Sequence, residues 1–500
     1  MSKFAHKVLS RLCAFLAATL LVTATAPVRA VGTEDLPDIG APWDAVLSQG
    51  EENQIGRMIV HRLRDADQLL DDPELGEYIQ SIGHRLSAHA QDSGQRFDFF
   101  MVRDPTINAF ALPGGYIGVN AGLLLATENE SELAGVLAHE VSHVTQRHIA
   151  RAAQSQGQTA LATTAGVIAA ILLGAATGMG DDAVQAALAV AQGVNAQHQI
   201  DFTRANEREA DRVGLNVLYQ AGFDPFGMPN FFEKLSHSTG ESQVPEFLLT
   251  HPVTTDRIAE TRDRAEKLGH VESQDSDSYA LMRERLRALV ADTPENALDA
   301  FTRLSDDNIT EASEALRYGY AVALLRAGRA GDAVALMRSL LAGRPTLVAY
   351  HIGLAQAQLA SGSTQDGLKT FAHAAELFPR NVPLTMRYAE ALMDTGEPGQ
   401  AHAMLLDLLN NISYTPQQVH LIALAANAAG ETAEAHYYMA ELHVMNGDLP
   451  LAINQLELAL ATPGLESVQR ARFEARISEI RQYLPEKQKR RAQDENRAPG

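Results

Sequence analysis

The sequence predicts a mostly α-helical protein, in which a helical domain with a small β-sheet is followed by a solenoid of helical hairpins. Three observations lead to this fold class. Apolar residues recur at helical spacing from residues 51–89 onward. Three short runs between residues 97 and 119 have the character of strands and are bounded by turn residues. The second half repeats a glycine every 34 residues. At 500 residues, the chain is also too long for one ordinary core.

The first thirty residues have the three parts of a secretory signal. Lys3, Lys7 and Arg11 give a positive start, and an apolar run follows from Leu12 to Ala24. Val28-Arg29-Ala30 then ends in the small-residue pattern of a cleavage site. The alternative is a membrane anchor that stays attached, but the apolar run is short for a bilayer span. We therefore expect cleavage near the end of this segment.

Composition narrows the compartment and the class of partner. The chain carries a formal net charge of −21 at pH 7, and its single cysteine, Cys13, lies inside the signal segment. So acidic a chain should repel nucleic acid, which excludes nucleic-acid binding as a function. A secreted chain whose mature part has no cysteine fits the bacterial periplasm.

Three strands and a long helix are predicted next. Phe97–Val102 and Asn108–Leu112 have strand character, and a Pro-Gly-Gly turn leads to a third strand at Tyr116–Val119. A helix is predicted from about Glu130 to Arg151.

Residues 152–180 contain no charged side chain. The stretch is either a membrane hairpin or a buried helical pair or flap. Alanine and glycine dominate it and contribute little transfer free energy, so the second alternative is favoured. A peripheral contact of this stretch with the membrane is a further alternative.

The second half contains an internal repeat. Its glycines, spaced by 34 residues, are Gly328, Gly362, Gly396 and Gly430. Each is followed five residues later by a small residue: Ala333, Gly367, Ala401 and Ala435. This period is that of the tetratricopeptide repeat, in which glycine allows a tight turn between two helices. Such a solenoid offers a concave groove to another protein.

A metal site is predicted on the long helix. His139 and His143 are four residues apart, so their imidazoles face the same way and can hold one zinc ion. Glu140 can reach a water on the metal and take its proton as the water attacks a carbonyl carbon. Histidine, glutamate and histidine at this spacing predict a helical zincin metallopeptidase.

A catalytic zinc needs a third protein ligand, and it is expected from another helix. His148 is a poor candidate, because on the same helix it would project from nearly the opposite side. Glu207 and Glu209 are the alternatives, and only one of them can face the metal. Glu207 is preferred because Asp211 lies one turn further on its face and could support a ligating histidine. Without the histidine pair, these acids would be an ordinary solvated helix face.

Two segments together resemble a known family. His139-Glu140-Val141-Ser142-His143 and Asn206-Glu207-Arg208-Glu209-Ala210-Asp211 resemble the peptidase family that includes HtpX and the CAAX prenyl proteases. The resemblance extends to Asn108–Leu123, to Thr250-His251-Pro252 with Arg257, and to the repeats. It implies that His139, His143 and Glu207 bind one zinc ion and that Glu140 is the catalytic base. It gives Asp211 a proton-donor or supporting role and makes His251 a possible fourth metal ligand. From the residues alone, His251 would be an ordinary loop histidine.

For secreted members with a repeat half, the resemblance implies outer-membrane protein quality control. Misfolded outer-membrane proteins would be degraded, and assembling ones helped, in contact with the assembly machinery through the repeats. Three functions compete: an active zinc endopeptidase, a binding or chaperone protein with a normally closed metal site, and a membrane-embedded protease. An intact Glu140 favours the first. The expected organisation is a signal peptide at 1–30, an extended arm at 31–44, a metallopeptidase domain at 45–270, a repeat domain at 275–485 and a disordered tail at 486–500.

Overall fold

The structure is a computed structural model that describes residues 48–90, 95–156, 196–237, 245–272, 275–306 and 308–484. The predicted signal peptide, arm and tail lie outside these residues, and so does most of the uncharged stretch at 152–180. Residues 46–500 fall into one unit. None of the described helices is long and apolar enough to cross a membrane.

In the part of the chain that the structure describes, two helices precede the sheet, where the sequence shows one long run of helical spacing. They are α2 (Gln49–Asp65) and α3 (Pro73–Ser87). A capping box on Ser48 begins α2, whereas the side chain of Asp72 accepts the N–H of Leu75 and begins α3. Pro73 occupies the first turn of α3, where no N–H is needed.

A three-stranded sheet follows, with strand order β1-β3-β2. Its strands are β1 (Asp98–Val102), β2 (Ala109–Leu112) and β3 (Tyr116–Asn120). β3 pairs parallel with β1 and antiparallel with β2, so β2 lies at an edge. The three predicted strands are thus present, each within one residue of its expected ends.

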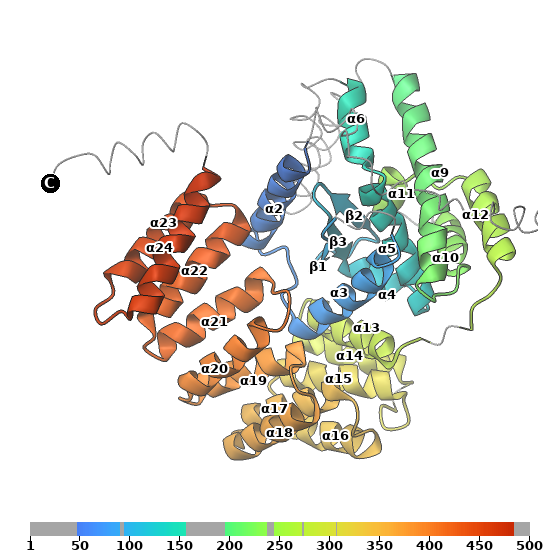
Figure 1. Ribbon diagram of the computed structural model, residues 1–500. Helices are drawn as coiled ribbons and strands as arrows, with labels where there is room; N and C mark the ends of the chain where they lie inside the picture. Colours follow the sequence, from blue (N-terminus) through green and yellow to red (C-terminus); the bar gives the residue numbers. More distant parts are fainter. Residues whose placement is uncertain are drawn as a thin grey trace, which may run out of the picture. The chain divides into compact units, whose positions relative to one another are not determined.

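The central helix of the first half is α5 (Glu130–Thr145), which is buried along most of its length. It packs against β2, against α9 (Ala196–Gln220) and against α10 (Gly227–His237) (Figure 1). The contact with α10 needs glycine, because a Cβ atom at Gly135 would lie 2.9 Å from the backbone of Met228.

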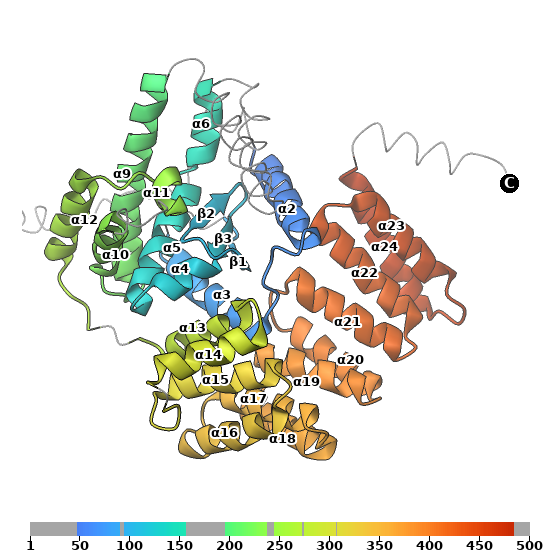
Figure 2. The ribbon, with the colours of Figure 1, turned by 180° about the vertical axis from the view of Figure 1, so that it is seen from behind.

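The helix predicted from Glu130 to Arg151 is interrupted, so this prediction is wrong in its length. α5 ends at Thr145, and Arg147 takes a left-handed backbone conformation with φ of 52°. A new helix, α6, begins at His148 and extends to Gln156 beside α9 (Figure 2). No glycine marks this break, so nothing in the local sequence indicated it. The other helices described in this half are α4 (Ala121–Ala126), α11 (Glu246–Thr250) and α12 (Thr255–Leu268).

The second half is a run of helical hairpins, as predicted. Its helices are α13 (Asp277–Val290), α14 (Pro294–Leu304), α15 (Glu314–Arg326), α16 (Ala330–Gly343), α17 (Val348–Ala360), α18 (Thr364–Leu377), α19 (Val382–Asp394), α20 (Pro398–Leu409), α21 (Pro416–Ala428), α22 (Thr432–Asn446), α23 (Leu449–Ala461) and α24 (Ser467–Gln482). The four repeat glycines all have positive φ at the turns. The predicted fold class, a helical domain with a small sheet followed by a tetratricopeptide solenoid, is confirmed.

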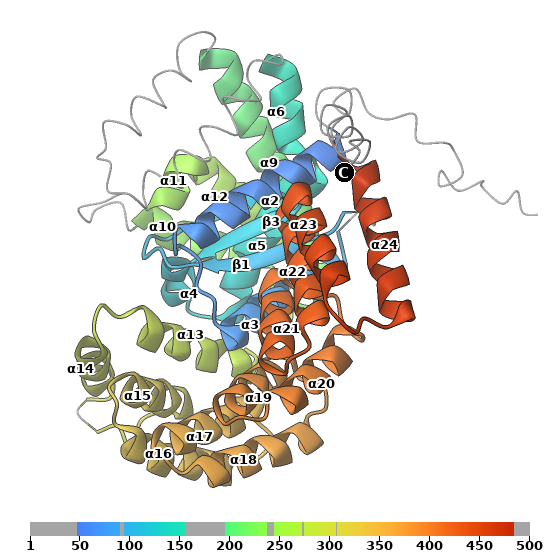
Figure 3. The ribbon, with the colours of Figure 1, turned by 90° about the vertical axis from the view of Figure 1, so that its left-hand side faces the viewer.

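Two acids at the start of α3 connect the two halves. Asp72 and Glu74, called the acid pair below, are buried. Arg285 of α13 donates to both carboxylate oxygens of Asp72, at 2.8 and 2.6 Å. Arg387 of α19 lies 2.8 Å from Asp72 and 3.0 Å from Glu74. Elsewhere, α2 lies near α22 (Figure 3). Arg57 of α2 donates to the carbonyl oxygen of Val444 at the end of α22.

Candidate metal centre

Helix α5 carries the first three site residues into the core. The side chain of Asn129 accepts the N–H of Glu132 and begins the helix. One turn separates His139 from His143, so both rings leave the same face. His139 is fully buried and Glu140 nearly so. The pairing predicted from the sequence is therefore present in the structure.

Four side chains from three segments meet at one point. The Nε2 atoms of His139 and His143 lie 3.0 Å apart. Glu207 of α9 places Oε2 3.4 Å from Nε2 of His139 and Oε1 3.4 Å from Nε2 of His143. His251, just after α11, places Nδ1 3.1 Å from Glu207 and 3.4 Å from His139. These ligand atoms all lie within 4.8 Å of one another, and the described residues contain no second group of this kind.

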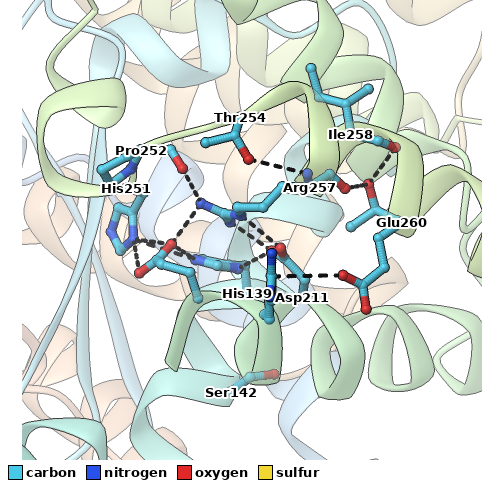
Figure 4. Close-up of polar contacts among 12 residues, drawn as sticks. His139, Ser142, Asp211, His251, Pro252, Thr254, Arg257, Ile258 and Glu260 are labelled. Carbon is cyan, nitrogen blue, oxygen red and sulfur yellow. Dashed lines mark hydrogen bonds and ion pairs between the residues drawn. The ribbon is translucent and has the colours of Figure 1, made fainter. Parts of the chain in front are cut away.

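Asp211 and Arg257 support these side chains from α9 and α12. Asp211 Oδ1 lies 3.0 Å from His139 Nδ1, the nitrogen that faces away from the centre, although the contact is not aligned for a full hydrogen bond. Arg257 donates to both oxygens of Asp211, at 2.8 and 2.7 Å, and lies 2.9 Å from Glu207 (Figure 4). It also donates to the carbonyl oxygen of Pro252 and so holds the loop after His251.

The charges of the site keep its carboxylates ionised. Burial alone would raise the pKa of Glu207, but His251 and the hydrogen bond from His139 outweigh it and hold that pKa well below its usual value. Burial is likewise outweighed at Asp211, where His139 and Arg257 lower the pKa. An ionised Asp211 suits the orientation of His139 better than proton donation. Burial alone would lower the pKa of His139, but Asp211 and Glu207 outweigh burial and raise this pKa to about 10. A proton therefore competes with a metal cation for His139.

Glu140 stands beside the centre rather than in it. Its carboxylate lies 3.5 Å from Nε2 of His251. Burial raises its pKa, and the nearby histidines partly oppose this effect. The backbone of Ala111, on the edge strand β2, also acts to lower this pKa. A position between the metal ligands and the edge strand β2 is one from which a carboxylate can act as a general base.

His148 and Glu209, which the sequence does not favour as metal ligands, lie next to the ligand cluster. His148 does not project from the opposite side, because the helix breaks before it and its ring returns to His143. Glu209 points away from the ligands, as expected, and contacts His148 and Arg151. Nothing in the local sequence indicates the break at Arg147. The contact between His148 and His143 could therefore not be predicted from the sequence.

The fold and the site define a metalloprotease joined to a tetratricopeptide solenoid. Residues 73–265 match the model of peptidase family M48, and residues 358–412 match a tetratricopeptide repeat model. The chain is 35% identical over 475 residues to the beta-barrel assembly-enhancing protease of Escherichia coli K12, covering 94% of this chain and 96% of that one. The Yersinia pestis protein of the same name is 35% identical over 452 residues, covering 89% and 91%. The mitochondrial metalloendopeptidase OMA1 of Schizosaccharomyces pombe is 31% identical over 203 residues, covering 40% and 56%. The chain belongs to the beta-barrel assembly-enhancing protease family, within peptidase family M48.

Proposed function

We propose that this metalloprotease is a zinc endopeptidase of the periplasm that takes part in outer-membrane protein assembly and degrades misfolded outer-membrane proteins. The observation that carries the proposal is the convergence of His139, His143, Glu207 and His251, with Glu140 beside them. The names of the relatives from Escherichia coli and Yersinia pestis support the link to barrel assembly. The signal-like first thirty residues support the compartment.

Zinc fits the ligand atoms better than magnesium or calcium. Tetrahedral zinc with bonds of about 2.0–2.1 Å keeps neighbouring ligand atoms about 3.3 Å apart. Here the two histidine nitrogens of α5 lie 3.0 Å apart, each lies 3.4 Å from a different oxygen of Glu207, and His251 Nδ1 lies 3.1 Å from Glu207 Oε1. Three imidazoles and one carboxylate also suit zinc, whereas magnesium and calcium prefer oxygen ligands. We propose His139, His143 and Glu207 as the permanent ligands.

Catalysis would combine the metal with Glu140 and the strand edge. When bound, zinc polarises the scissile carbonyl and lowers the pKa of water. Glu140 takes a proton from the attacking water and then delivers it to the leaving amine. An extended substrate would pair with the free edge of β2, which reads backbone rather than side chains. Glu140→Gln should keep the fold and the metal, while proteolysis of a misfolded outer-membrane protein falls by at least ~10²-fold. Near-native proteolysis by that variant would remove Glu140 from the mechanism.

His251 would regulate access to the metal. Its Nδ1 faces the ligands at 3.1–3.4 Å, in the position that water needs. We propose that His251 binds zinc at rest and leaves when substrate moves its loop. His251→Ala should then raise basal proteolysis while zinc content stays nearly full. A variant slower than native on every substrate would make His251 a substrate-binding or structural residue.

The same observation favours a second candidate function. A centre that is closed by four protein ligands suits a chaperone-like binding protein that cuts only rarely. The division of work would place catalysis in residues 45–270 and binding of client proteins or assembly machinery in residues 275–485. If Glu140→Gln supports barrel assembly as well as the native chain, binding is the main function.

A further inference from the structure

We propose that His148 is a positioning residue that orients the metal ligand His143, and that Glu209 fixes His148 in turn. The inference deepens the proposed metal site and rests on it. It concerns two residues that do not reach the ligand cluster themselves.

The backbone break between α5 and α6 brings His148 back to the site. On an unbroken helix, a residue five positions after His143 would point well away from it. Arg147, with φ of 52°, interrupts the helix before α6 begins. The rings of His143 and His148 then lie 4.8 Å apart between centroids and nearly perpendicular, at 78°. Only 4% of His148 is exposed, so it is enclosed at this place.

The contacts of His148 determine where each proton lies. A His143 that gives its Nε2 lone pair to a metal must carry its proton on Nδ1. The Nδ1 atoms of His143 and His148 are 2.9 Å apart, so His148 Nδ1 must accept that proton and carry none. His148 therefore carries its own proton on Nε2, which faces Glu209 Oε2 at 3.3 Å. Arg151 donates to the same oxygen at 2.8 Å. Each N–H in this series of contacts, from His143 through His148 to Glu209, thus faces an acceptor.

Both histidine ligands of α5 thus have a partner on the nitrogen that faces away from the metal. For His139 the partner is Asp211, which contacts it directly. For His143 the carboxylate of Glu209 acts through the ring of His148. Such partners fix the tautomer and the ring orientation of a metal-ligating histidine, and their loss typically weakens metal binding by about 10–100-fold.

The chain offers variants that separate positioning from simple packing. His148→Phe keeps a buried ring but removes the acceptor, and we expect it to weaken zinc affinity by about 10–100-fold in competition with a chelator. His148→Asn places an oxygen near the position of Nδ1, and it should recover most of the affinity. His351→Phe is the control, because His351 is equally buried, at 3% exposed, but lies in α17 of the solenoid. The visible absorption of the cobalt-substituted chain should shift in His148→Phe and not in the control.

A second pair of variants tests Glu209 without altering the histidine. Glu209→Ala should weaken zinc affinity, whereas Arg208→Ala, its exposed neighbour, should not. Circular dichroism of the metal-free chains checks that each variant is folded. Native affinity in both His148→Phe and Glu209→Ala would overturn the inference, as would an equal loss in Phe and Asn variants at position 148. His143→Ala separates a failure of this inference from a failure of the proposed metal site. Native zinc affinity in that variant would overturn the metal site itself.

Discussion

Arg257 connects the carboxylate proposed to bind the metal with the carboxylate that supports His139. It is itself buried, and it pairs with Asp211 at 2.7 Å and with Glu207 at 2.9 Å. Glu207 therefore has one cation beside it even before a metal binds. Glu209, two residues along the same helix, has a different environment of His148 and Arg151. The two acids should respond differently to substitution.

We expect Glu207→Ala to lose stoichiometric zinc, because it removes a ligand atom from the centre. Glu209→Ala should still bind one zinc per chain when zinc is in excess, because it removes only the support of His148. Metal analysis after dialysis against excess zinc measures the difference. Loss of zinc from the Glu209 variant alone, under these conditions, would exchange the two assignments.

The helices illustrate which parts of the fold could be predicted. The histidine pair, the three strands and the repeat glycines each leave a local pattern, and each is present. The break at Arg147 leaves none, because a left-handed conformation usually calls for glycine or asparagine. Its side chain is instead held at 2.9 Å from Glu52, a residue of α2 that is 95 positions away. Contacts at such separations cannot be read from local spacing.

The close packing of α10 on α5 can be tested by substituting a glycine of α5. Gly135→Ala should destabilise the protein by about 1–3 kcal/mol, because a Cβ atom would lie 2.9 Å from the backbone of Met228. Gly76→Ala on α3 is the matched control, since a Cβ atom there meets nothing within 4 Å. The control should be neutral or slightly stabilising, because alanine is the better helix former. Thermal unfolding of both variants decides; equal melting temperatures would contradict the packing argument.

At the scale of the whole molecule, the acid pair joins the protease half to the solenoid. Its two arginines come from α13 and α19, so helices far apart in sequence converge on the start of α3. Arg285 also donates to the hydroxyl of Tyr318 at 3.2 Å. The sequence indicated both halves but not this contact, because no repeat pattern marks Arg285 or Arg387.

Removing one arginine should lower the free energy of unfolding, because the two buried acids then have one cation fewer beside them. Arg387→Ala leaves Asp72 and Glu74 with Arg285 alone, and we expect a loss of about 3 kcal/mol in the free energy of unfolding. Arg329→Ala breaks an exposed pair with Asp332 in the same solenoid and should change little. Urea denaturation of the two variants makes the comparison. A similar effect in both would mean that the acid pair contributes no more than a surface contact.

The same acid pair predicts a pH dependence. Burial would raise the pKa of Asp72, but Arg285 outweighs it and lowers the pKa to about 2, from 3.8. A folded pKa below the unfolded one stabilises the protein above pH 4, and this contribution disappears as pH falls toward 2. The difference in unfolding free energy between the native chain and Asp72→Asn should therefore shrink over that range. Burial raises the pKa of Glu74 and Asp72 raises it further, so Asp72→Asn also removes part of that rise and offsets some of the difference. A difference that stays constant with pH would contradict the assignment.

The acid pair also sets an order of events during synthesis. Its partners follow Asp72 by 213 and 315 residues. At about 5–20 residues per second, a ribosome needs roughly 15–60 s to add the longer stretch. During that time the residues of α3 and α5 have been made, whereas Arg387 has not. The protease half therefore cannot complete this contact with the solenoid until the chain has been made at least as far as Arg387.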